Sequence, residues 1–80
     1  MRQFSDDDLL CAERRVREVE RHVVRQKVVV AMFEVLGDTA EAQHARLYLA
    51  LQEQRLKVAR EALQQIRVQR ARASFRVIGK

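Results

Sequence analysis

The amino-acid sequence predicts an all-α protein, an antiparallel two-helix hairpin. Three observations support this fold class. Apolar residues recur at alternating spacings of three and four positions along two long segments, which is typical of helices that bury one face. The chain has 80 residues and no proline, so nothing interrupts either segment. One of its two glycines, Gly37, lies near the middle, where a helix can end and the chain can reverse direction.

The first helix is expected over residues 6–36. Ser5 is a preferred N-cap residue, and Asp8 lies three positions later, where it can complete a capping box. Gly37 favours the left-handed conformation that ends many helices. We call the row of side chains expected to face the other helix the seam. In the first helix the seam consists of Leu9, Ala12, Val16, Val19, Val23, Gln26, Val30 and Phe33.

The second helix is expected over residues 39–74. Asp38 and Glu41 have the spacing of a second capping box, so the connection is only two or three residues long. A connection that short makes the helices antiparallel neighbours. Residues 75–80 are expected to form a frayed basic tail, and the whole chain, 1–80, is one domain. The second seam consists of Ala42, Ala45, Leu49, Gln52, Leu56, Ala59, Leu63, Ile66, Arg70 and Ala73.

The two seams can be aligned, because facing residues of an antiparallel hairpin have position numbers with a nearly constant sum. Placing Phe33 opposite Ala45 defines one register. The same register sets Gln26 opposite Gln52, the only polar members of the two seams before the frayed end. We interpret these residues as a polar core layer that fixes the register at some cost in stability. The alternative is that both glutamines lie at the edge of the seam and reach water.

Apolar residues outside the seams predict self-association. Residues 28–36 and 45–51 are apolar almost all the way round the helix, and two helices in contact cannot cover that much surface. We therefore expect a homodimer that forms a four-helix bundle with coiled-coil packing, or a larger assembly. The expected oligomer interface contains Val24, Val28, Ala31, Val35, Leu47 and Leu51.

Two short motifs resemble a known group of sequences. They are the R-H-x-x-R-Q segment at residues 21–26 and the G-D-T turn at residues 37–39. Over about residues 13–63 the chain resembles uncharacterised short helical-hairpin proteins of alphaproteobacteria. The resemblance implies the hairpin fold and no known activity. His22, in the first motif, could form a polar patch with its arginine neighbours, or it could be a hydrogen-bonded histidine on the flank of the seam.

Basic charge collects in the second half of the chain. Lys and Arg number 16 against 11 Asp and Glu, and residues 41–80 hold nine basic and three acidic residues. Such a cluster can bind nucleic-acid phosphates with a strong dependence on salt, or an acidic protein. As an alternative, the register places the tail beside residues 6–8, whose aspartates would neutralise part of its charge. The candidate nucleic-acid contacts are Arg67, Arg70, Arg72 and Arg76.

An E-x-x-H pattern suggests a metal-binding alternative. Glu41 and His44 are three positions apart in the second helix, and the register brings Glu34 near them. In a dimer, two such sets would match the ligand count of a di-metal carboxylate bundle. The competing interpretation assigns Glu41 to the helix cap, and Glu34 and His44 to a surface pair. We expect this second interpretation to hold, with no metal or other cofactor.

The composition argues against an enzyme. A chain of 80 residues with four aromatic side chains can barely enclose a substrate pocket. Its longest apolar run, residues 28–33, is far shorter than the roughly 20 residues of a membrane span. No basic and then apolar leader precedes Asp6, so the expected location is the cytoplasm. The sequence therefore predicts a small non-enzymatic interaction or assembly module that acts as a homo-oligomer.

Overall fold

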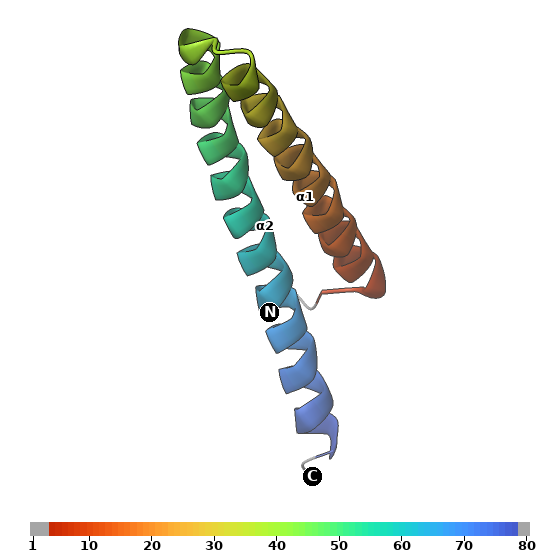
Figure 1. The fold of residues 1–80 in the computed structure, drawn as a ribbon. Helices are drawn as coiled ribbons and strands as arrows, with labels where there is room; N and C mark the ends of the chain where they lie inside the picture. Colours follow the sequence, from red (N-terminus) through yellow and green to blue (C-terminus); the bar gives the residue numbers. More distant parts are fainter. Residues whose placement is uncertain (1–3, 79–80) are drawn as a thin grey trace.

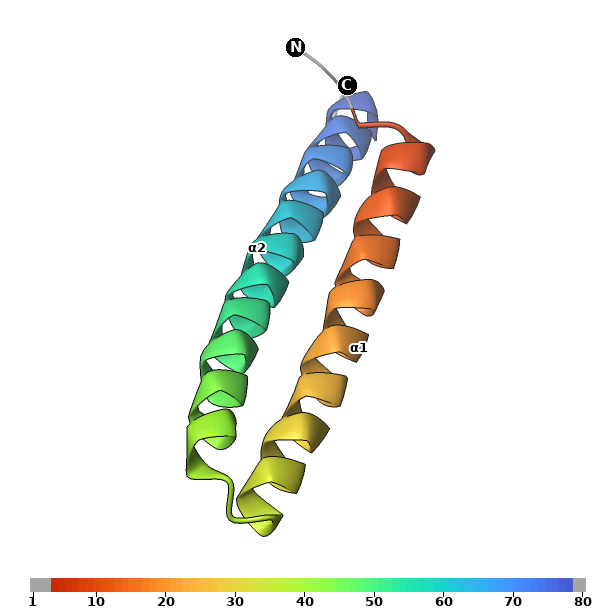
Figure 2. The same cartoon turned by 90° about the horizontal axis from the view of Figure 1, so that it is seen from above.

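The structure is a computed structural model, and it describes residues 4–78, with side chains to residue 74. Two helices account for nearly all of this part: α1 spans Asp6–Val35 and α2 spans Thr39–Ile78. They run antiparallel and lie side by side (Figures 1 and 2). Together they form a rod of 64 × 17 × 15 Å. The all-α hairpin expected from the sequence is confirmed.

The start of α1 is capped as the sequence predicts. The Ser5 side chain accepts a hydrogen bond from the Asp8 amide at 3.2 Å, and the Ser5 amide donates to the Asp8 carboxylate at 2.9 Å. The two bonds form a capping box, which satisfies backbone groups that a helix end leaves unpaired. The first helical turn is entirely acidic through residue 8, and these charges face the positive end of the helix dipole.

The connection is closed by a left-handed glycine. Gly37 has a φ of +75°, and its amide donates to the Glu34 carbonyl at 3.1 Å. The Asp38 amide donates to the Phe33 carbonyl at 3.0 Å, so the turn has the bonding of a Schellman motif. The Asp38 carboxylate accepts the Glu41 amide at 3.1 Å and caps α2. The expected capping box also requires the Asp38 amide to donate to the Glu41 side chain. The Asp38 amide donates to the Phe33 carbonyl instead, so only the first bond of the box forms.

The buried residues are those of the two seams. The central cluster consists of Val16, Val19, Val23, Leu56, Ala59 and Leu63. Ion pairs join the helices at Glu20–Arg60 and Asp6–Arg70, close to the positions that the expected register requires. The core is only one layer thick, and in the described part no large side chain is completely covered.

The end of α2 differs from the expected one. The helix continues to Ile78, four residues beyond the expected end at 74. No glycine or proline occurs between residues 38 and 78, and the final segment is rich in arginine and alanine, which favour helix. Of the expected frayed tail, residues 75–78 are therefore helical, and residues 79–80 lie outside the described part.

Candidate functional site

The two glutamines of the expected polar layer do not bond to each other. The half-buried Gln26 donates from Nε2 to the Ala45 carbonyl oxygen at 3.0 Å. Gln52 is only 4% exposed, and none of the hydrogen bonds among the described residues involves its carboxamide. In the same part of the chain every fully covered side-chain nitrogen or oxygen has a partner. The Gln52 carboxamide must therefore touch the surface of the hairpin.

Gln52 opens on a small recess between the helices, which we call the polar recess. Its volume is about 170 Å³. Helix α1 contributes two charged residues and a histidine, and α2 adds an arginine and a tyrosine beside the glutamine. The lining consists of Arg15, Glu18, Val19, His22, Tyr48, Gln52 and Arg55. Two guanidinium groups face one carboxylate here, so the polar recess is rich in hydrogen-bond donors and net positive.

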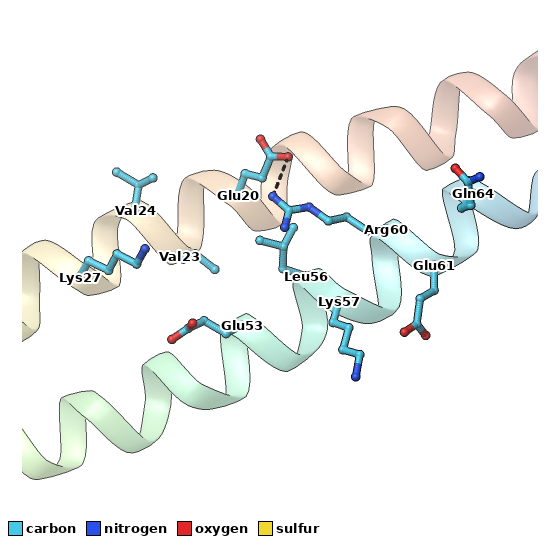
Figure 3. Close-up of a pocket in the computed structure, with 10 residues that line it drawn as sticks. All are labelled: Glu20, Val23, Val24, Lys27, Glu53, Leu56, Lys57, Arg60, Glu61 and Gln64. Atoms are coloured by element: carbon cyan, nitrogen blue, oxygen red, sulfur yellow. Dashed lines mark ion pairs between the residues drawn. The ribbon is translucent and has the colours of Figure 1, made fainter. Parts of the chain in front are cut away.

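A larger groove (Figure 3) lies between the same two helices and shares no lining residue with the polar recess. It has a volume of about 740 Å³ and contains the Glu20–Arg60 ion pair, with 3.6 Å between its charged atoms. Its six charged residues are three acids and three bases, so the groove carries no net charge. The ten residues that line it are Glu20, Val23, Val24, Lys27, Glu53, Leu56, Lys57, Arg60, Glu61 and Gln64.

Sequence reasoning singled out Gln52, His22 and the seam residue Val19 but missed the other residues of the polar recess. The predicted patch joined His22 to Arg21 and Arg25. In the structure these two arginines border a separate shallow depression beside Val24. The sequence could have located the recess if the residues beside each seam had been compared. His22 and Gln52 line the same recess, and Arg55 follows Gln52 by three positions on α2.

The six residues of the expected oligomer interface are all exposed. Of the eleven exposed large apolar side chains in the described part, eight lie within residues 24–51. We call these eight the turn-half apolar surface: Val24, Val28, Met32, Val35, Leu36, Leu47, Tyr48 and Leu51. They reach both cavities between the helices, since Val24 borders the large groove and Tyr48 borders the polar recess.

The arginines of the tail do not share one face of α2. Arg70 pairs with Asp6, as the alternative interpretation of the tail proposed. Arg67 and Arg72 are exposed, and the side chain of Arg76 lies outside the described part. Successive residues of a helix are separated by about 100°, which places Arg70 and Arg72 on nearly opposite sides of α2.

The metal constellation is not assembled within the hairpin. Glu34 accepts hydrogen bonds from Arg46, the shorter at 2.8 Å, so the surface pair expected with His44 is wrong. An arginine presents a charged fork to a carboxylate, a bidentate geometry that an imidazole cannot offer. Glu41 follows the Asp38 cap. Within the described residues no three His, Cys, Asp or Glu side chains could hold a metal ion.

Comparison with known proteins offers no further guide to the site. No protein-family model, curated protein or solved structure matches this chain. Neither helix, as far as it is described, has a stretch long and apolar enough to pass through a bilayer. Function therefore has to be argued from the surface of the hairpin itself.

Proposed function

We propose that this protein is a non-enzymatic assembly module that associates with further copies of itself. The observation that carries the proposal is the turn-half apolar surface, which leaves side chains such as Val35 and Leu47 at 87% and 70% exposure. Exposed apolar side chains that gather in one half of a small protein mark protein contacts in soluble proteins. The contact we propose is the packing of two hairpins into a four-helix bundle.

The accessible area of the chain supports this proposal. A compact monomer of 9.4 kDa would expose about 5,000 Å², whereas this chain exposes 6641 Å². The radius of gyration also shows an extended shape, because it is 18.3 Å and a compact domain of this length has about 12 Å. A standard interface covers about 800 Å² of each partner. The excess area is therefore large enough for a stable dimer contact.

The distribution of charge supports contact at the turn end. Residues 24–51 contain three basic and three acidic residues, while the whole chain carries a net charge of +5. Two turn halves can therefore meet without like-charge repulsion. Residues 52–80 contain eight basic and two acidic residues. An arrangement that overlaps the turn halves and points the tails in opposite directions keeps these positive segments apart.

A matched pair of surface variants tests the proposal. Val28 and Leu10 lie on α1 with 55% and 56% exposure, but only Val28 belongs to the turn-half apolar surface. We expect sedimentation velocity to give at least twice the 9.4 kDa chain mass for the native protein and for Leu10→Glu. Val28→Glu should shift the protein to the monomer mass, because association would bury the new charge.

A monomer mass for the native protein at all concentrations would overturn the proposal. Equal dissociation of both variants would show that the contact is not at the turn half. Co-sedimenting nucleic acid that is released by salt would instead favour Arg67 and Arg72 as the working surface, and Arg67→Glu would then abolish the binding.

A further inference from the structure

The polar recess contains a polar group that the fold itself does not explain. Gln52 is 4% exposed and has no hydrogen-bond partner among the described residues. Because its carboxamide reaches the surface, that amide is available to a partner from solution. Its open side is the polar recess, so a group that enters the recess can supply the partner that the protein does not.

The two arginines around Gln52 also form no ion pair within the described chain. Among the described residues, four arginines form ion pairs: Arg17, Arg46, Arg60 and Arg70. Arg15 and Arg55, which line the polar recess from α1 and α2, take part in none of the ion pairs of the described chain. Two guanidinium groups therefore stand at one recess with Glu18 as the only carboxylate in its lining.

The size and the donor set restrict the ligand. The volume of about 170 Å³ is that of about six water molecules at about 30 Å³ each. It lies well below the roughly 300 Å³ at which pockets for drug-sized ligands begin. Guanidinium forks bind planar carboxylates and tetrahedral oxyanions in a bidentate manner. The recess lining also includes the Gln52 amide and the Tyr48 hydroxyl. Together with the two guanidinium groups, these offer more hydrogen-bond donors than the two oxygens of a carboxylate can accept.

We propose that the polar recess binds a small tetrahedral oxyanion, either phosphate or the terminal phosphoryl group of a small phosphomonoester. Arg15 and Arg55 bind it from the two helices, and the Gln52 side-chain amide donates to it from the recess floor. Most of the recess lies outside the turn-half apolar surface, and Tyr48 is the residue that the two share. Binding would also stabilise the packing of α1 against α2, because the ligand bridges the two helices.

Calorimetric titration with inorganic phosphate tests the proposal, with ionic strength held constant by sodium chloride. We expect saturable binding to the native protein and a rise in its melting temperature. Arg15→Gln and Arg55→Gln should each weaken binding about tenfold, which is the loss expected for one charge-assisted contact. The control is Arg14→Gln, since Arg14 is equally charged and exposed but does not line the recess; its affinity should equal that of the native protein.

The source of the oxyanion is resolved by a second titrant, glycerol phosphate. Tighter binding of glycerol phosphate than of phosphate would assign the site to a phosphomonoester, and equal or weaker binding would assign it to the free anion. Absence of saturable binding with both titrants would overturn the proposal. An equal loss in Arg14→Gln would also overturn it, because the effect would then be diffuse charge attraction. Sedimentation of each variant reports self-association separately.

Discussion

Gln26 and Gln52 are the glutamines of the two seams, and their side chains have different surroundings. Gln26 donates to the Ala45 carbonyl at 3.0 Å, whereas Gln52 is nearly covered and has no partner among the described residues. The bonded Gln26 amide contributes to the fold, whereas the Gln52 carboxamide reaches only the surface from a site that is otherwise covered. The two residues should therefore respond in opposite ways to the same substitution.

We predict that Gln52→Leu raises the free energy of unfolding by about 1 kcal/mol, because an apolar side chain of similar size gains more from a site that is only 4% exposed. Gln26→Leu should lower it by about 1 kcal/mol, since the bond to Ala45 is lost. Urea unfolding followed by circular dichroism gives both values. Changes of the same sign in the two variants would contradict this assignment.

The contrast between a seam residue and a surface residue gives a second prediction. Val30 is 8% exposed and Val28 is 55% exposed on the same helix. Val30→Asp should unfold the hairpin, because the new carboxylate is buried without a partner. Val28→Asp should keep more of its helical circular dichroism at the same protein concentration. A helical Val30→Asp variant would mean that the seam is less tightly packed than the structure shows.

At the scale of the helices, the position of the reversal depends on Gly37. Its φ of +75° places it in the left-handed region, which costs residues with a side chain roughly 1–2 kcal/mol. A Cβ at this position would have no atom within 4 Å. Glycine is therefore favoured at this position because of its backbone conformation, and not because a side chain would lack space.

We predict that Gly37→Ala lowers the free energy of unfolding by about 1 kcal/mol. Gly37→Asn should cost less, since asparagine tolerates the left-handed conformation better than alanine does. The helix content of both variants should stay unchanged, because the open space admits either side chain. A chemical denaturation series provides the comparison, and an alanine variant as stable as the native chain would mean that the turn can relax to another form.

At the scale of the whole molecule, the hairpin is a rod with one layer of core. Its largest dimension is 64 Å and its smallest is 15 Å, so most of its side chains remain in contact with water. A small chain of this shape buries too little apolar surface to be very stable alone. Association with a second copy would then supply part of the stability.

Self-association predicts a melting temperature that depends on protein concentration. For the native protein we expect it to rise with each tenfold increase in concentration, because mass action favours the folded oligomer. Val28→Glu should melt at one temperature at all concentrations, and lower than the native protein. Differential scanning calorimetry over a dilution series measures both. A native melting temperature that stays constant on dilution would argue for a self-sufficient monomer.

Much of the fold could be predicted from the sequence, and less of the candidate site. The seam residues Val16, Val23 and Leu56 were predicted from spacing alone, because burial on a helix follows its period. The Ser5 cap was predicted because capping is a local interaction. The pairing of Glu34 with Arg46 was not predicted from the sequence. Both His44 and Arg46 lie within a few residues of the turn, and the length and geometry of the side chain determine which of them contacts the carboxylate.

The sequence by itself determined that the chain makes two helices, where they reverse at Gly37, and which row of each helix is buried. These features follow from periodicity, caps and backbone conformation, which act over a few neighbouring residues. Only the tertiary structure decided what the long polar side chains meet. Gln26 turns to a backbone carbonyl, Gln52 to the polar recess, and Arg15 and Arg55 come to one recess from separate helices. Such contacts depend on the rotation of each helix about its axis and on side-chain rotamers, which seam spacing leaves undetermined.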